Sequence, residues 1–201
     1  MLSILWRTTM NKNLFVKTCI ENAYEIRKYH KNEILFNEND LCNYLAIIKR
    51  GNIRITSYTF NGNEMVFKNL TANDCFGESL LFSSYPYYKG TITSINDSEI
   101  AYIKKDAVLQ LLSNPSLLKI YLNMLSEEIL LTKEKQRILS FHNVQDRLLY
   151  WLHLQHKIVY KSITDLAKEL AVSRESLSRA LKSLCEKNLI TMKGKCIVLV
   201  K

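Results

Sequence analysis

The chain has 201 residues, of which 47% are hydrophobic and 10% aromatic, and only two are prolines. This composition excludes a disordered, collagen-like or small disulfide-stapled protein, and the length suits one or two packed domains. Lysine and arginine number 28 against 19 aspartates and glutamates, a net charge of +9. Such an excess favours a polyanionic partner, nucleic acid or an anionic membrane, although a merely basic surface explains it equally well.

The sequence does not indicate a membrane-spanning, secreted or metal-binding protein. No apolar stretch reaches the roughly 18 to 20 residues that span a bilayer. The apolar stretch within the opening segment MLSILWRTTM is too short for a secretory signal. The five cysteines are scattered without a C-x-x-C pair, which favours a cytoplasmic chain without disulfides or a metal site. The His153 and His156 pair has no nearby acid or thiol to complete a site. Met10 is a second candidate start, so residues 1–9 need not be native.

The first half of the chain predicts many short strands. From Tyr29 to Lys104, alternating runs such as YLAIIKRGNIRITSYT, EMVFKNL and SEIAYIKK are separated by turns rich in Asn, Asp and Gly. Four of the five glycines lie in this region, each near a break between runs. This pattern is typical of an antiparallel sandwich or barrel, which forms the N-terminal domain.

A long helix follows the strands. Asn114 is a suitable N-cap and Pro115 suits the first helical position of a helix of about 25 residues, or roughly 37 Å. One face steps by four and three residues along a seam, defined as Leu118, Leu122, Leu125, Ile129, Thr132, Gln136 and Leu139. The seam either packs on its own sheet or forms a two-stranded coiled coil, and the helix length favours a homodimer.

The last quarter of the chain carries most of the charge imbalance. From Gln145 onward there are 11 Lys and Arg residues against 5 Asp and Glu residues, which is +6 of the net +9. Within it, SITDLAKELAVSRESLSRALKSLCEKNLI predicts a short helix, a turn at Ala171 and Val172, and a second helix capped by Ser173. A hairpin ITMKGKCIVLV follows as a wing. This is helix-turn-helix geometry, in which the second helix enters the major groove of DNA.

Residues exposed on that second helix and on the wing are the candidate DNA-binding residues. Arginine is the commonest reader of guanine O6 and N7, glutamate accepts from cytosine N4, and lysine contacts phosphate. A helical pair that contacts protein through solvated charges is the alternative. The candidates are Ser173, Arg174, Glu175, Ser178, Arg179, Lys182, Lys193 and Lys195.

The order of strands, long helix and winged helix-turn-helix opening with SRESLSR resembles the Crp/Fnr family of bacterial regulators. The resemblance covers residues 26–200, and its most specific parts are this helix, the segment Asn188-Leu189-Ile190 and the dipeptide Gly77-Glu78. It implies an α+β protein with three parts. These are a sensor β-barrel of the cyclic-nucleotide-binding jelly-roll type with an N-terminal helical segment (1–113), a dimerisation helix with hinge (114–143) and a winged helix-turn-helix (144–201). It also implies that Arg174, Glu175 and Arg179 read a TGTGA-type half-site of a palindromic operator, with RNA polymerase as a further partner.

The resemblance does not extend to the segment that binds the phosphate of a cyclic nucleotide in the family, called the phosphate cassette. In the family this segment runs from Gly-Glu to an Arg-Ser pair, and here the latter positions are Tyr88 and Lys89. The guanidinium that clamps a cyclic phosphate is therefore missing, and cyclic AMP is not expected to bind. In one interpretation the site is filled by core aromatic residues, namely Tyr85, Tyr87 and Tyr88. The alternative is an effector pocket, whose candidate residues are Gly77, Glu78, Tyr88, Lys89, Thr132 and Lys133.

The sequence therefore predicts a dimeric, sequence-specific transcription regulator, controlled by an unidentified signal or active without one. The signal would act through a hinge at Phe141–Asn143. No Gly-rich phosphate loop or nucleophile–base motif indicates an enzyme, and no cofactor is identified. Cys75 beside the cassette is either a redox-reactive thiol or an ordinary buried cysteine. A small-molecule-binding or adaptor protein, whose helical domain contacts protein, is the alternative function.

Overall fold

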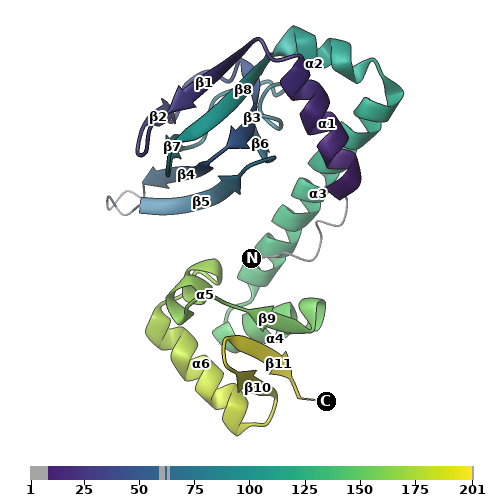
Figure 1. The fold of residues 1–201 in the computed structure, drawn as a ribbon. Coiled ribbons are helices and arrows are strands. Elements are labelled where there is room, and N and C mark those ends of the chain that lie inside the picture. Colours follow the sequence, from purple (N-terminus) through teal and green to yellow (C-terminus); the bar gives the residue numbers. More distant parts are fainter. Residues whose placement is uncertain (1–8, 59–61, 63, 201) are drawn as a thin grey trace. The chain divides into compact units, whose positions relative to one another are not determined.

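The computed structural model describes residues 9–58, 62 and 64–200, and it divides into two units. One unit ends at Ser126 and the other begins at Glu127, inside the long helix α3 (Pro115–Ser140; Figure 1). Most of the opening segment MLSILWRTTM lies outside the described residues. The predicted α+β class, with a strand-rich first part, a long helix and a helical last part, is confirmed.

The first unit contains two antiparallel sheets of four strands. One has the order β1 (Glu25–Tyr29), β8 (Ser98–Lys104), β3 (Tyr44–Arg50) and β6 (Cys75–Phe76). The other has the order β2 (Ile34–Phe36), β7 (Thr91–Ser94), β4 (Asn52–Tyr58) and β5 (Glu64–Thr71). No pairing joins the two sheets among the described strands, so of the predicted alternatives, sandwich or barrel, the unit has the open, two-sheet form and not a closed barrel. The outermost strands each have one neighbour, and β6 spans only two residues, which is too short a ladder for closure.

Strands β3 and β8 are covered on both faces. Ile48 and Ile100 point into the core between the two sheets, whereas Leu45, Ile47 and Ile103 belong to a second core beneath the helices. Because successive side chains in a strand point to opposite faces, both faces must be apolar here. This explains why the sequence reads YLAII and IAYI as continuous apolar runs rather than alternating ones.

The helices of this unit are α1 (Thr9–Glu21), α2 (Lys105–Leu112) and the first turns of α3. Phe15, Val108 and Tyr121 bring them onto the second core. The predicted start of α3 is confirmed, since the Asn114 Oδ1 accepts hydrogen bonds from Ser116 N at 2.9 Å and Leu117 N at 3.4 Å. Helix α2 and strand β1 were not expected from the sequence patterns.

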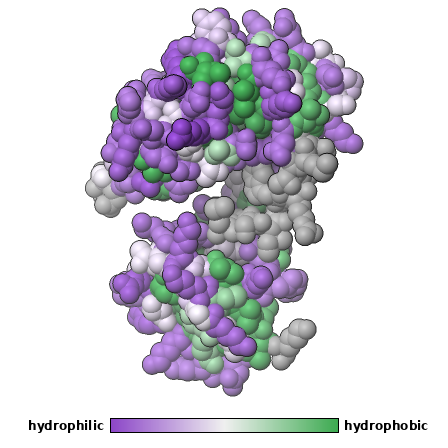
Figure 2. Space-filling model, viewed as in Figure 1, coloured by the Kyte–Doolittle hydropathy of each residue, from purple (hydrophilic) through white to green (hydrophobic). Residues whose placement is uncertain are grey.

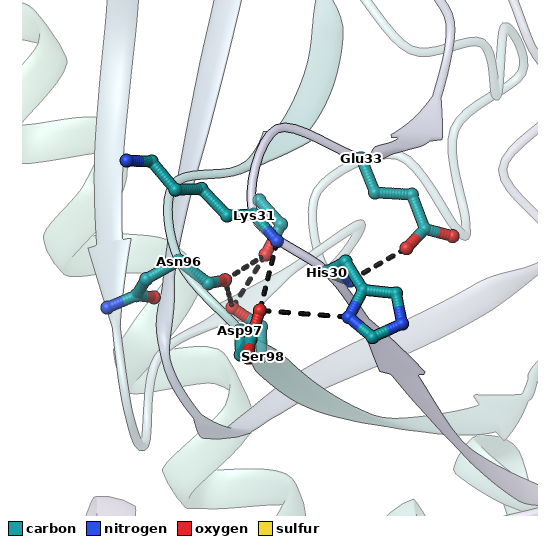
Figure 3. Close-up of polar contacts among 7 residues, drawn as sticks. His30, Lys31, Glu33, Asn96, Asp97 and Ser98 are labelled. Carbon is teal, nitrogen blue, oxygen red and sulfur yellow. Dashed lines mark hydrogen bonds and ion pairs between the residues drawn. The ribbon is translucent and has the colours of Figure 1, made fainter.

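Two turns at one corner of the unit bind the sheets together. Figure 3 shows the turn after β1, with His30 and Glu33, beside the turn after β7, with Asn96 and Asp97. The backbone N–H of Lys31 donates to the Asp97 carboxylate at 3.1 Å, and that of His30 donates to Glu33 at 2.7 Å. Because β1 and β8 lie in one sheet and β2 and β7 in the other, these bonds fix the corner between them.

The second unit contains the last turns of α3 and a winged helix-turn-helix. Its elements after α3 are α4 (Val144–Gln155), β9 (Lys157–Val159), α5 (Ile163–Glu169), α6 (Arg174–Glu186), β10 (Ile190–Lys193) and β11 (Cys196–Leu199). The strands form one antiparallel sheet in the order β10-β11-β9. The two helices, their turn and the wing are confirmed, whereas α4 and β9 were not predicted. No helix among the described residues is long and apolar enough to cross a membrane.

Candidate nucleic-acid interface and sensor cassette

Helix α6 presents its candidate residues to solvent. The Ser173 side chain caps the helix by accepting a hydrogen bond from Ser176 N at 3.1 Å. Leu177 and Leu184 on the opposite face are fully buried in the core of the unit. The candidate side chains all lie on the exposed face, as required for reading DNA, and they are Ser173, Arg174, Glu175, Ser178, Arg179 and Lys182. Figure 2 shows a largely hydrophilic surface over α6.

Glu175 is held as an anion at the start of the helix. Its pKa lies below the ordinary value because the carboxylate accepts hydrogen bonds from its own backbone N–H and from the Ser173 hydroxyl. Arg174 and Arg179 lower the pKa further through their charge. The helix N-terminus favours a negative charge in the same way. Glu175 is therefore available as a hydrogen-bond acceptor at neutral pH.

The turn that precedes α6 is tight. Ala171 adopts a left-handed backbone conformation with φ of 53°, which the sequence pattern did not reveal. Val172 N donates to Ala167 O at 3.0 Å, and Ala167 is buried, so the two helices approach closely at a small side chain. The turn thus sets the direction in which α6 leaves α5.

The wing carries two exposed lysines. Lys193 and Lys195 flank Gly194 at the turn between β10 and β11. Tyr160, which follows β9, donates from its backbone N–H to Lys195 O at 3.1 Å and from its hydroxyl to Gly194 O at 3.4 Å. This tyrosine was not found from the sequence, because nothing in its spacing connects it with the wing. The lysines themselves stay predicted phosphate contacts.

In the first unit, Gly77 and Glu78 follow β6 at the start of the cassette. Gly77 has φ of 85°, and a Cβ there would lie 2.6 Å from the Tyr44 carbonyl oxygen, so only glycine fits. Glu78 is 8% exposed, and its carboxylate lies 3.7 Å from the Lys68 Nζ on β5. The Tyr121 hydroxyl on α3 donates to the Glu78 carbonyl oxygen at 2.7 Å. Neither Lys68 nor Tyr121 was expected, since both lie on elements outside the cassette, β5 and α3.

Tyr88 occupies the position of the family's arginine as a core residue. It is 3% exposed, and its ring centroid lies 4.7 Å from that of Phe36 and 6.4 Å from that of Phe76. Burial raises the pKa of Tyr88, so the hydroxyl stays neutral beside the Cys42 thiol. Tyr85 is exposed and stacks under Lys89 at 3.9 Å, so it fills no part of the site.

The structure brings only some of the predicted effector residues together. Gly77, Glu78 and Tyr88 are close neighbours, whereas Lys89 is exposed and lies over the Tyr85 ring. Thr132 and Lys133 are exposed residues of the other unit, and their role stays a prediction. The Thr132 hydroxyl donates to the Glu128 carbonyl oxygen at 2.8 Å within α3.

The buried cysteines of this unit are poor redox groups. Burial raises the pKa of Cys19 to about 12 and raises those of Cys42 and Cys75 as well. Since the thiolate is the reactive form, the structure favours the ordinary buried cysteine at position 75. No group of three or more His, Cys, Asp or Glu residues in the described part of the chain is placed to hold a metal ion.

Comparison with known proteins assigns both units. Residues 26–114 match the cyclic nucleotide-binding domain and residues 146–201 match the Crp-like helix-turn-helix domain. The chain belongs to the Crp/Fnr family of transcription regulators. An anaerobic regulatory protein of Bacillus subtilis is 27% identical over 194 residues, which cover 89% of this Crp/Fnr chain and 82% of that protein. The cAMP-activated global transcriptional regulator CRP of Salmonella typhimurium is 27% identical over 188 residues, covering 86% and 88%.

Solved structures of low sequence identity share the fold of this Crp/Fnr regulator. The c-di-GMP responsive global regulator CLP of Xanthomonas campestris aligns with a TM-score of 0.62 at 23% identity, over 94% of this chain and 99% of that one. CprK complexed with OCPA aligns with a TM-score of 0.70 at 12% identity, over 92% and 91%. These solved structures show the fold alone, whereas the two matched domain families and the curated relatives make the chain a transcription regulator with a helix-turn-helix DNA-binding domain, which is not an enzyme.

Proposed function

We propose that this Crp/Fnr regulator binds a palindromic operator as a homodimer and that the start of α6 reads each half-site. The observation that carries the proposal is the exposed cluster of Arg174, Glu175 and Arg179 on a helix whose other face is buried. Two guanidinium groups suit guanines, and the ionised Glu175 suits the cytosine opposite one of them. A TGTGA-type half-site has this composition, and Ser178 adds a thymine or backbone contact.

The seam of α3 supports dimerisation. Leu122 is 52% exposed and Ile129 is 54% exposed, although both are large and apolar. Leu125 is partly covered by the core of the first unit. A second copy of α3 packed along the seam would remove the exposed leucine and isoleucine from water, as in a two-stranded coiled coil. The two-fold symmetry would then place half-site centres about 10 to 10.5 base pairs apart.

The proposed DNA target also implies a compartment and a second partner for the regulator. Operator binding requires access to chromosomal DNA, so we place the protein in the cytoplasm. RNA polymerase would be its second macromolecular partner at the promoter. Whether bound protein activates or represses transcription would depend on where the operator lies relative to the polymerase.

We further propose that the cassette does not bind cyclic AMP. The Tyr88 ring fills the place where a guanidinium would clamp phosphate, and the Glu78 carboxylate already has the Lys68 ammonium beside it. Bringing a phosphate next to a buried, neutral tyrosine would leave the charge uncompensated. Calorimetric titration of the protein with up to 1 mM cyclic AMP or cyclic GMP, a concentration corresponding to about −4.1 kcal/mol, should give no binding heat. Saturable heat together with a raised melting temperature would contradict this.

The regulator function is tested by fluorescence anisotropy on a TGTGA-type palindrome and a scrambled duplex of equal length. We expect tighter binding to the palindrome by about 10³-fold or more at near-physiological salt, without added ligand. Affinity for the scrambled duplex should fall steeply between two salt concentrations. Weak binding without sequence preference would instead favour the adaptor function.

A further inference from the structure

Arg147 connects two separate segments of the second unit. It lies in the first turn of α4, where Arg147 N donates to Asn143 O at 3.3 Å. Its Nε donates to the Phe141 carbonyl oxygen at 2.9 Å, and its Nη1 donates to the Leu170 carbonyl oxygen at 2.7 Å. The first acceptor follows the end of α3 at Ser140, and the second caps the end of α5.

Both acceptors lie at helix C-termini. The last carbonyl groups of a helix lack intrahelical donors and carry partial negative charge, so a cation there is favoured. A planar guanidinium donates in two directions at once, which a lysine ammonium on a flexible stem does not reproduce with the same geometry. Among the described residues no carboxylate forms an ion pair with Arg147, so these two carbonyls are the groups that orient it.

The Leu170 contact bears directly on the recognition helix. Leu170 lies three positions before Ser173, the cap of α6, and the left-handed Ala171 lies between them. A shift of the Leu170 carbonyl therefore shifts the point from which α6 starts. Arg147 itself is only half-buried and lies on a different helix from every candidate base contact.

Contacts with α4 hold the end of α3 against the rest of the second unit. The Tyr150 hydroxyl donates to the Glu134 carboxylate at 3.2 Å, and the Arg137 guanidinium lies 5.1 Å from the centre of the Tyr150 ring. The Phe141 ring lies 5.1 Å from the same ring, and Ile138 belongs to the core of the unit. The segment Phe141–Asn143, predicted as a hinge, is thus held on both sides.

We propose that Arg147 is a positioning residue for DNA recognition, which fixes the α5–α6 turn against the end of α3. The inference rests on the proposed operator binding. Because protein–DNA discrimination depends on base contacts in a fixed register, loss of this clamp should affect the specific complex. It should leave the nonspecific complex alone, since that depends on phosphate contacts which Arg147 does not supply.

The test compares wild type with Arg147→Gln and Arg147→Lys on the palindrome and the scrambled duplex at two salt concentrations. We expect both variants to lose about tenfold in affinity for the palindrome, which is roughly the 1.4 kcal/mol of one charge-assisted hydrogen bond. Binding to the scrambled duplex and its dependence on salt should stay unchanged. Arg50→Gln, which removes an exposed arginine from the first unit, is the matched control and should behave as wild type.

The outcomes separate this inference from the proposed function. If wild type itself does not prefer the palindrome, operator binding fails. If wild type prefers it and both Arg147 variants keep that preference, only the positioning role is overturned. Equal loss on both duplexes with a shallower salt dependence would make Arg147 a phosphate contact. Equal loss with an unchanged salt dependence and a lower melting temperature would make it a merely structural residue.

Discussion

Replacing Arg179 by alanine is expected to weaken binding to the palindrome by about 1–3 kcal/mol, or roughly five- to 150-fold. Arg179 is exposed on α6, five residues beyond Arg174, so its side chain reaches a base edge when the helix lies in the major groove. Loss of a bidentate guanine contact should also relax discrimination at that one base pair. Anisotropy titrations against duplexes with each half-site position changed in turn measure both effects.

The control for this variant is Arg50→Ala, which removes an exposed arginine from the first unit. It should lower the net charge equally without changing discrimination at any position. Equal binding of wild type and Arg179→Ala to the palindrome and to the scrambled duplex would show that Arg179 does not read a base.

Replacing Ile129 by glutamate is expected to abolish the dimer and to reduce operator affinity by at least 100-fold. A charge in the middle of the α3 seam would be buried against its own copy across the two-fold axis, which is strongly unfavourable. A monomer reads one half-site and loses the gain that linking two binding modules provides, which is commonly 10²- to 10⁴-fold. Sedimentation velocity gives the oligomeric state, and anisotropy gives the affinity.

Leu130→Glu supplies the matched control. Leu130 is 52% exposed, almost as much as Ile129, yet it lies off the seam at the next position of the same helix. It should leave the dimer intact. An Ile129→Glu protein that sediments as a dimer would contradict the assignment of the seam as the dimer interface.

Patterns of local sequence predicted the DNA-binding half more fully than the sensor half. Ser173, Asn114 and Ser162 cap helices through contacts two or three residues away, so a cap residue and a periodic apolar stripe were enough to find α6 and α3. The wing was found because two apolar runs flank Gly194. Helix α4 was missed, although Asn143 caps it and Trp151 and Leu152 are buried in it.

The cassette could be predicted only as a set of positions. Alignment to the family showed that an arginine was missing, but it did not show that Tyr88 packs against Phe36 on β2. Likewise, the closeness of Lys68 to Glu78 depends on how β5 lies beside the segment after β6. Contacts between residues on different elements follow from sheet order, which periodicity alone does not determine.

Helix α3 belongs to the hydrophobic cores of both units, through Leu117, Ile120 and Tyr121 in the first and Ile138 in the second. The loop after Ser140, where a protein engineer would ordinarily cut to exchange DNA-binding modules between regulators, therefore separates Ile138 and Glu134 from the partners that they pack against. Chimeras joined within α3, near Ser126 and Glu127, would keep the hydrophobic core of each unit intact. In this protein the transferable module is larger than the winged helix, because it includes the last turns of the helix that leads into it.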